Sequence, residues 1–353
     1  MRSPDDSMRP PKIVVPTTRN LATKLDLRIV RVDQLTWRRK RCGHGFAYFD
    51  ETGRRIREKS TLTRLKSLAV PPAYESVMYS SDARAHLQAI GRDAAGRLQY
   101  RYHPDWEKVR EARKAHRLAQ FVEALPRIRR RINHCLSGSD CNREFALAAL
   151  IELVASSAIR PGSEEYAKQH GTRGAATLLK SNLHMADGKL VLSFRAKGGK
   201  HVQREVDSPL LAEAIDRLRA IPGKRLFQYR DETGIHAVSA RDANAFLQEI
   251  AGTAITLKDF RTLCASASVL EELAKVKPEP SMRGRRKQIL EAVRSAAGEL
   301  ANTVAVCRKS YVHQAVVDAF ENGVLEDYAD ALKSARSQAK RERVLAEVVA
   351  SRA

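Results

Sequence analysis

The chain has 353 residues, with 63 Lys and Arg against 41 Asp and Glu, which gives a formal net charge of +22 at pH 7. Hydrophobic residues make up 43% of it, so a sizeable core is expected and wholesale disorder is excluded. A charge of this sign and size favours a polyanionic partner, with nucleic acid first and an anionic membrane second.

Location and cysteine chemistry follow from simple patterns. No apolar run is long enough to cross a bilayer, and the polar, Pro-rich N-terminus lacks the apolar segment of a signal peptide. The five cysteines form no C-x-x-C pair, so neither a zinc site nor a disulfide framework is expected. We expect a cytoplasmic protein with reduced thiols that does not span a membrane.

The first third of the chain is predicted to be rich in β-strands. Residues 1–20 are expected to be a flexible leader, and residues 21–103 a small β-rich domain. Aromatic or alternating runs such as FAYF and LQYRYH flank the turn sequences DETGRR and RDAAGR, which indicates strands joined by tight turns. TLTRLKSL, at residues 61–68, is predicted to be a helix.

Residues 104–353 are predicted to form a larger, mainly helical domain. Basic amphipathic helices are expected over residues 106–136, and the most apolar helix stops near Arg160, where Pro and Gly follow. Residues 175–206 are expected to form a small sheet of hairpins with turns at MADGK and AKGGK. Further helices are predicted at 209–221, 240–252, 256–276, 284–300, 310–325 and, as one helix, 329–353. The fold class is therefore α+β.

Several motifs are missing, which restricts the chemistry. The sequence has no phosphate-binding G-x-x-x-x-G-K-[ST] loop, no H-E-x-x-H motif and no G-x-S-x-G elbow, so no ATP, metal or other cofactor is expected. Attack on a phosphodiester without a metal needs a nucleophile, cations at the non-bridging oxygens and a proton donor for the leaving oxygen. Tyrosine, arginine and lysine can fill these three roles.

The sequence offers these residue types at separated places. Arg160 follows the apolar helix, Lys197 lies at a hairpin tip, Arg261 lies near a helix start, and Asn302 and Tyr311 share the stretch NTVAVCRKSY. Each has a structural alternative. The first arginine would offset a helix dipole, and the lysine would be a solvated turn residue. The second arginine would be a surface or salt-bridge residue, and the tyrosine would pack in the core.

In combination and in this order, these residues resemble the catalytic set of type IB DNA topoisomerases, and most closely the compact poxvirus-like branch found in bacteria. GRDAAGRLQYRYHPDW, at residues 91–106, is similar to the G-x-D-x-x-G-R-x-Q-Y-x-Y segment of that family. AIRPGSEEY, FRAKGGK, LKDFRT and NTVAVCRKSY stand in family order and at family-like spacing. The resemblance extends from about residue 27 to about residue 320.

The resemblance implies a nucleoid-associated monomer that acts on double-stranded DNA and binds no membrane, with residues 21–103 as its DNA-binding domain and residues 104–353 as its catalytic domain. It also implies a mechanism. Tyr311 would attack a DNA phosphodiester and form a 3′-phosphotyrosyl enzyme, while Arg160 and Arg261 clamp the non-bridging oxygens. Lys197 would give a proton to the departing 5′ oxygen. The free end would rotate about the intact strand, relaxing supercoils of either sign before religation, without ATP or a metal.

One position departs from many family members. Asn302 stands nine residues before Tyr311, where many members carry histidine, although the bacterial branch resembles this sequence in carrying asparagine. An amide N–H donates to a phosphate oxygen but cannot titrate, so Asn302 is predicted to bind oxygen without acting as an acid or base. His313 is expected on a different helix face and is not a substitute.

The strand LQYRYH is predicted to bind DNA. On a strand, Gln99 and Arg101 face one way, and Tyr100 and Tyr102 the other. By resemblance this strand faces the major groove, where Gln reads a base edge and Tyr contacts phosphate; the alternative is that the tyrosines pack in the core of the module. The remaining predicted DNA contacts are Lys200, Lys258, Arg308 and Lys309.

Two other classes of protein share some of these features. A tyrosine recombinase has similar Arg, Lys and Tyr chemistry, but that family usually carries histidine where Lys258 stands, and its N-terminal domain is usually helical. A non-catalytic basic DNA-binding or chromatin protein fits the charge equally well but gives no reason for the ordered motifs.

Overall fold

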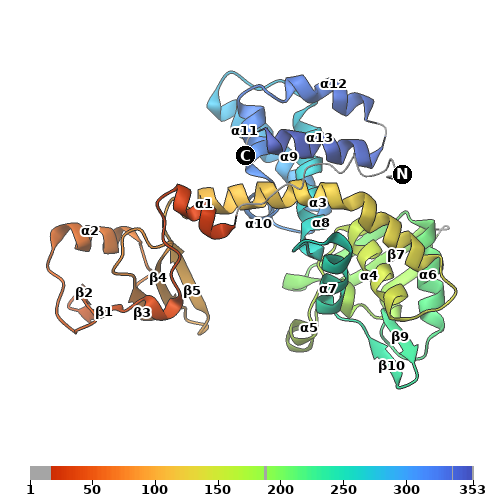
Figure 1. Cartoon of the computed structure of the whole chain (residues 1–353), viewed down its shortest axis with the longest axis horizontal. Helices are drawn as coiled ribbons and strands as arrows, with labels where there is room; N and C mark the ends of the chain where they lie inside the picture. The colour runs from red at the N-terminus through yellow and green to blue at the C-terminus, as the bar shows by residue number, and fades with distance from the viewer. Residues whose placement is uncertain (1–16, 187–188, 336, 352–353) are drawn as a thin grey trace, which may run out of the picture. The chain divides into compact units, whose positions relative to one another are not determined.

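The structure is a computed structural model that describes residues 17–186, 189–335 and 337–351 (Figure 1). The chain divides into two compact units between Lys114 and Ala115, which lie inside the long helix α3 (Trp106–Leu136). The sequence places the domain boundary earlier, after residue 103, because the composition changes there. We call the two parts the N-terminal unit and the C-terminal unit and describe each by itself.

Residues 1–16 of the predicted leader lie outside the described residues, and residues 18–20 belong to a helix instead. Helix α1 (Thr18–Lys24) begins where the Thr17 hydroxyl accepts a hydrogen bond from the Asn20 N–H, 3.2 Å away. Its apolar residues Leu21 and Ala22 are buried in a cluster with Val109 of α3. Capping and burial together explain the helix.

The N-terminal unit is built around a five-stranded antiparallel sheet, which confirms the predicted β-rich module. The strand order is β2-β1-β3-β4-β5, and Ile90 of β4 pairs with Tyr100 of β5. Its core contains Tyr48, Leu65 and Tyr79, and Leu65 comes from the predicted helix at 61–68, observed as α2. The elements are η1 (Val32–Gln34), β1 (Trp37–Cys42), β2 (Gly45–Phe49), α2 (Lys59–Ser67), β3 (Glu75–Tyr79), β4 (Leu87–Arg92) and β5 (Leu98–Tyr102).

The C-terminal unit is mainly helical, with a three-stranded sheet inserted after α5, so the α+β fold class is confirmed. The helices are α3, α4 (Arg143–Ser157), α5 (Glu164–His170), α6 (Pro209–Ala220), α7 (Ala240–Ala251), α8 (Leu257–Leu273), α9 (Met282–Glu299), α10 (Val304–Ser310), α11 (Gln314–Glu321), α12 (Glu326–Ser334) and α13 (Gln338–Ala350). The sheet, ordered β6-β7-β8, contains β6 (Leu183–Ala186), β7 (Lys189–Arg195) and β8 (His201–Val206), and short 3-10 turns occur at Ala175–Thr177, Lys180–Asn182 and Lys197–Gly199.

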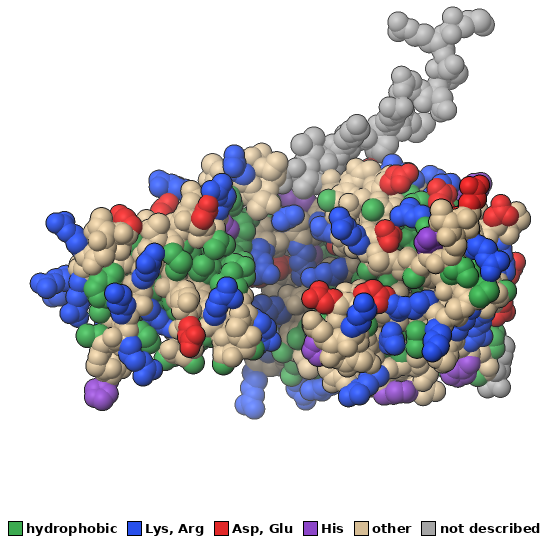
Figure 2. All heavy atoms as spheres, turned by 90° about the horizontal axis from the view of Figure 1, so that it is seen from below, with side chains coloured by type: hydrophobic (Ala, Val, Ile, Leu, Met, Phe, Trp, Pro, Cys, Tyr) green, Lys and Arg blue, Asp and Glu red, His purple; other side chains and the backbone are tan. Residues whose placement is uncertain are grey.

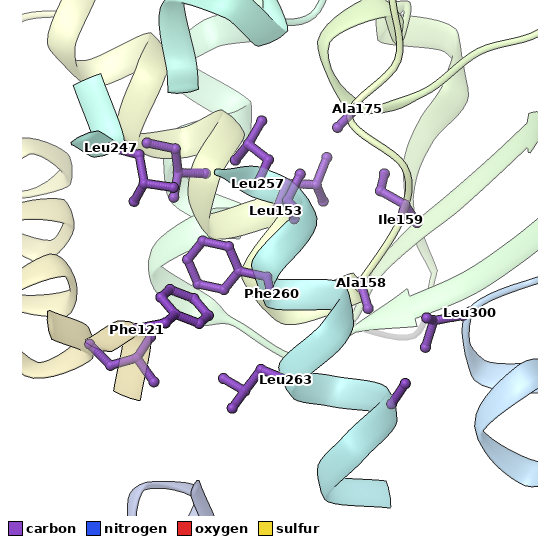
Figure 3. Close-up of a cluster of buried hydrophobic side chains, with 14 of the residues drawn as sticks. Phe121, Leu153, Ala158, Ile159, Ala175, Leu247, Leu257, Phe260, Leu263 and Leu300 are labelled. Carbon is purple, nitrogen blue, oxygen red and sulfur yellow. The ribbon is translucent and has the colours of Figure 1, made fainter. Parts of the chain in front are cut away.

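Helices α4 and α8 form the centre of the core in the C-terminal unit. Ten of the fifteen residues of α4 are buried, as its uniformly apolar sequence predicts. Phe260 of α8 packs edge-to-face on Phe121 of α3 with ring centroids 4.8 Å apart. Figure 3 shows that Ala158, Ile159 and Leu300 belong to the same cluster. The core therefore extends past the C-termini of α4 and α9 and includes the residues that directly follow these helices.

Two predicted helices need correction, and one hairpin was not predicted. The predicted helix at 310–325 is broken at 311–313, and the predicted single helix at 329–353 is two helices, because the Ser337 hydroxyl caps a new one. A two-stranded hairpin of β9 (Gln228–Asp231) and β10 (Gly234–Ala237) has no predicted counterpart. The predicted MADGK turn includes residues 187–188, which lie outside the described residues.

The surface reflects the composition. Figure 2 shows Lys and Arg side chains spread widely over the face it displays, with fewer Asp and Glu among them. Within the described ranges, no helix is long and apolar enough to cross a membrane. The five cysteines are free thiols.

Candidate active site

Arg160 lies just past the end of α4, as predicted. The residue that follows the helix, Ala158, adopts a left-handed conformation with φ of 51°. The loop that follows is held by a close approach of two glycines. A Cβ on Gly174 would lie 2.6 Å from the Gly162 Cα and 2.7 Å from the Arg160 carbonyl oxygen, so only glycine fits there. The Ala175 N–H also donates to that carbonyl, at 2.8 Å.

Asn302 is buried and bonded to Arg160, although the two residues are 142 positions apart in the sequence. The Arg160 Nη2 donates to the Asn302 Oδ1, and the Asn302 backbone N–H donates to the Ala297 carbonyl oxygen at 2.9 Å. The buried Nδ2 of Asn302 has no hydrogen-bond partner in the part of the chain that the structure describes. The amide is therefore oriented with its two N–H donors available for an acceptor such as an oxygen anion.

Arg261 is the most deeply buried cation of the site, with 1% of its surface exposed. Its guanidinium donates to the carbonyl oxygens of Ala158 and Leu300, the latter at 3.1 Å. Burial lowers the pKa of Arg261, and Tyr311 opposes that shift. The group still stays charged at any working pH. The surface alternative for this arginine is wrong, because its neighbours are backbone carbonyls of the core.

Tyr311 does not lie inside a helix. It is the residue at which α10 ends, and its N–H donates to the Cys307 carbonyl oxygen at 3.0 Å. Its own carbonyl oxygen accepts a hydrogen bond from the Ser266 hydroxyl on α8, at 3.0 Å. The Tyr311 ring is half-buried beside two cations: its centroid is 4.8 Å from the Arg261 Cζ and 5.7 Å from the Lys258 Nζ.

His313 begins the next helix, so the prediction that places it on a helix face beyond Tyr311 is wrong. It is 2% exposed and is the N-cap of α11, where its Nδ1 accepts the Ala315 N–H at 3.1 Å. Its backbone N–H donates to the Ser266 hydroxyl at 3.0 Å. Ser266 thus bonds both sides of the break between α10 and α11. No signal in the sequence marks this serine, because its two partners are backbone groups of a distant segment.

Lys197 is exposed at the tip of the β7–β8 hairpin, as predicted. Its Nζ lies 5.1 Å from the centroid of the Tyr166 ring on α5, and that ring stacks on His170 with centroids 4.1 Å apart. The neighbouring Ala196 lines one small cavity together with Arg160 and Arg261. The structure thus brings four predicted residues together and places the lysine on a loop beside them.

Comparison with known proteins identifies the family. The catalytic core of eukaryotic DNA topoisomerase I matches residues 101–342, and the N-terminal domain of bacterial DNA topoisomerase IB matches residues 45–93. The chain belongs to the type IB DNA topoisomerase family. The DNA topoisomerase 1B of Acanthamoeba polyphaga mimivirus is 30% identical over 292 residues, which are 80% of this chain and 87% of the viral protein. The DNA topoisomerase 1B of Vaccinia virus strain Copenhagen is 22% identical over 244 residues, 67% and 73% of the two chains.

The protein is therefore a type IB topoisomerase enzyme, which confirms the resemblance seen in the motifs and favours neither a recombinase nor a non-catalytic binding protein. Among the residues that the structure describes, no three His, Cys, Asp or Glu gather as potential metal ligands. Two cationic side chains, Lys258 and Arg261, lie beside the Tyr311 ring in this topoisomerase.

In the N-terminal unit of this topoisomerase, strand β5 presents its tyrosines to solvent. Tyr100 is 44% and Tyr102 41% exposed, and their rings stack with centroids 6.1 Å apart, so the alternative that they pack in the core is wrong. Gln99 donates to the Asp93 carboxylate at 2.9 Å. Arg101 is exposed and donates to a backbone carbonyl oxygen at 3.1 Å.

The other predicted DNA contacts lie in the C-terminal unit. Lys200, Lys258 and Lys309 are exposed, and Arg308 is half-buried and donates to the Gln314 side chain. Lys200 follows the Lys197 tip, and Lys258 lies in the first turn of α8 near the Tyr311 ring. These placements leave the three ammonium groups open to a polyanion.

Proposed function

We propose that this topoisomerase relaxes supercoiled DNA by cutting one strand with Tyr311 and rejoining it, through a 3′-phosphotyrosyl intermediate and without ATP or a metal ion. The observation that carries this proposal is the convergence of four side chains from distant segments. Arg160 bonds Asn302, and Arg261 lies against the ring of Tyr311. A tyrosine among fixed cations is what attack on a phosphodiester requires.

In the proposed cleavage step, the Tyr311 Oη releases its proton to water and forms a bond to phosphorus, while the bond from phosphorus to the 5′ oxygen breaks. Arg160 and Arg261 stabilise the charge that develops on the non-bridging oxygens, since guanidinium groups bind phosphate oxygens in a fixed fork. The Nδ2 of Asn302, which has no partner among the described residues, supplies a neutral donor to one of the same oxygens. Religation is the same reaction in reverse, with the 5′-hydroxyl as the nucleophile.

Lys197 would donate the proton that the leaving 5′ oxygen needs. Its hairpin tip is suited to movement, because Gly198 and Gly199 adopt φ of 78° and 74° and nothing lies within 4 Å of the position that a Cβ on Gly198 would take. A short shift of this tip would take the ammonium from the Tyr166 ring towards the bound phosphate. The phosphotyrosine bond conserves the energy of the phosphodiester, so no nucleotide hydrolysis is needed.

DNA would be bound by the groups that the structure leaves open to solvent. Tyr100 and Tyr102 on β5 are available for phosphates, and Gln99 and Arg101 for base edges and backbone, once their internal hydrogen bonds are exchanged. Around Tyr311, the phosphates would be contacted by Lys200, Lys258, Arg308 and Lys309.

The decisive experiment is a plasmid relaxation assay in EDTA without ATP. Relaxation of both negatively and positively supercoiled plasmid is expected, and binding without relaxation would contradict the proposal. Tyr311→Phe should bind DNA with about the wild-type affinity and form no covalent adduct after denaturation with detergent. Tyr328→Phe, on α12, is a matched control that should still form adducts. Adducts that persist in Tyr311→Phe would show that another residue is the nucleophile.

A further inference from the structure

Arg204 has no role in the function proposed above, yet its guanidinium lies next to the four converging residues. It comes from strand β8, is half-buried and lines the same small cavity as Arg160 and Arg261. Its Nη1 donates to the carbonyl oxygen of Ser157, and its Nη2 to that of Glu299. Burial lowers the pKa of this guanidinium, with Cys264 and Glu299 opposing the shift.

The two acceptors are the last residues of two helices. Ser157 ends α4, and Glu299 ends α9. The last carbonyl groups of a helix have no partner within it and carry the negative end of the helix dipole. A cation that donates to both carbonyls therefore ties the C-termini of α4 and α9 together.

Arg261 connects the same two segments, the chain after α4 and the chain after α9, one residue further along each. It donates to the carbonyl oxygens of Ala158 and Leu300, which directly follow Ser157 and Glu299. Arg160 and Asn302 then stand two residues beyond those acceptors and are bonded to each other. Residues 157–160 are thus joined to residues 299–302 by three sets of hydrogen bonds, each made by an arginine. Arg204 and Arg261 each bridge a carbonyl of one segment to the equivalent carbonyl of the other, and Arg160 bonds Asn302 directly.

We propose that Arg204 is a positioning residue that sets the register between these two segments, and thereby holds Arg160 and Asn302 where they bind the scissile phosphate. It donates to backbone carbonyls, so it acts on the phosphate only through those two residues. It also ties the hairpin that carries Lys197 to both segments, because β8 is the strand that follows the hairpin tip. This inference rests on the proposed function of the site.

The test is single-turnover cleavage of a duplex that carries a site cut by the wild-type enzyme, with enzyme in excess. Arg204→Ala should slow cleavage by ~10–100-fold, since a misplacement of about 1 Å at a reacting centre costs ~100-fold. DNA affinity should change by less than about threefold, because Arg204 touches no DNA. Arg204→Lys should recover part of the rate, since an ammonium can donate to both carbonyls.

A double-mutant cycle separates positioning from a general structural effect. In an Arg160→Ala background, Arg204→Ala should cost clearly less than it does alone, because both changes act on the same phosphate contact. Arg219→Ala is the matched control. Arg219 is also half-buried and donates to two backbone carbonyls, those of Lys180 and Leu183, but it does not line the cavity with Arg160. Its loss should lower the unfolding temperature and leave the cleavage rate within about threefold of wild type.

Three results would overturn the inference: a folded Arg204→Ala that cleaves at the wild-type rate, an equal loss in both backgrounds, or an equal loss in Arg219→Ala. If Arg204→Ala does not fold, the same comparisons are made with Arg204→Lys and Arg204→Gln, measured well below their unfolding temperatures. A wild-type enzyme that forms no adduct would contradict the proposed function instead. The two failures are therefore distinguishable.

Discussion

At the scale of single residues, the site depends on how each polar group is satisfied. The Asn302 Oδ1 accepts from Arg160, which leaves only N–H donors free on that amide. Both Nη groups of Arg261 donate to backbone carbonyl oxygens, and its buried Nε has no partner among the described residues. Unsatisfied donors in a buried site cost free energy unless an acceptor enters. Both groups are therefore prepared for an anion before DNA arrives.

The role proposed for Lys197 gives a prediction at this scale. Lys197→Ala should slow cleavage by ~100-fold or more, the usual contribution of a general acid. A substrate whose bridging 5′ oxygen is replaced by sulfur should recover most of that loss, because a thiolate leaves without a proton. Single-turnover rates on both substrates measure the effect. Lys189→Ala, on the same hairpin and paired with Glu205, is the matched control. A loss of equal size on both substrates would mean that Lys197 is not the acid.

At the scale of elements, helix ends rather than helix faces place the functional groups. Arg160 and Asn302 follow the C-termini of α4 and α9, and Tyr311 ends α10. A helix end leaves carbonyl groups that cations can bind, and the backbone beyond it is free to turn. This explains why Tyr311 contacts Arg261 at the break between α10 and α11, where the apolar periodicity predicts a continuous helix.

The N-terminal sheet has a pH dependence that also belongs to this scale. His86 precedes β4 and His103 follows β5, and each Nδ1 accepts a backbone N–H, from Val30 and Asp105 respectively. Burial lowers the pKa of both imidazoles below 6.5. The folded unit thus takes up protons less readily than the unfolded chain. The contribution of these two histidines to stability is fully present above pH 6.5, and it is lost as the pH falls through their lowered pKa values in the folded protein.

Thermal unfolding at pH 7.5 and pH 5.5 tests this prediction. The two tryptophans of the chain, Trp37 and Trp106, both lie in the N-terminal unit, so their fluorescence reports on it. The midpoint should be lower at pH 5.5, and His86→Gln should reduce the difference. His44→Gln, at an exposed site in the same unit, should leave the difference unchanged. Equal midpoints at both pH values in the wild-type protein would contradict the prediction.

At the scale of the whole molecule, charge governs the affinity for DNA. The net charge of +22 comes mostly from exposed Lys and Arg, while Arg261, one of the two arginines proposed to bind the scissile phosphate, is buried and the other, Arg160, is bonded to Asn302. Exposed cations bind phosphate by releasing counterions, which makes binding sensitive to salt. Buried cations are screened much less. Binding and cleavage should therefore respond differently to ionic strength.

This difference can be measured directly. Between 50 and 200 mM salt the DNA affinity should fall by ~1,000-fold or more if six or more phosphates are contacted. The single-turnover cleavage rate at saturating enzyme should change by less than about threefold. Lys309→Gln should reduce the slope of log affinity against log salt by ~1, the contribution of one phosphate contact. An affinity that hardly depends on salt would contradict the electrostatic account of binding.

Much of the architecture could be predicted, because the signals are local. Alternating aromatic runs, turn residues and helical periodicity predict the β-rich unit, α2, α4 and the hairpin with Lys197 at its tip. The prediction failed where a single side chain decides the local structure. Ser337 begins a helix inside the predicted tail helix, and His313 begins α11 inside a continuous apolar pattern. Hydrophobic periodicity does not reveal a helix boundary at such a cap when the apolar pattern continues on both sides of it.

The sequence by itself determined the family, through the order and spacing of its motifs, and with it the candidate residues Arg160, Lys197, Arg261, Asn302 and Tyr311. Only the tertiary structure decided how they are held. It joined Arg160 to Asn302 across 142 positions and buried Arg261 between two helix ends. It also brought in Arg204 and Ser266, which no motif marks. The physical reason is that residue type and spacing encode local conformation. Hydrogen bonds from long side chains to distant carbonyls depend on how the helices pack.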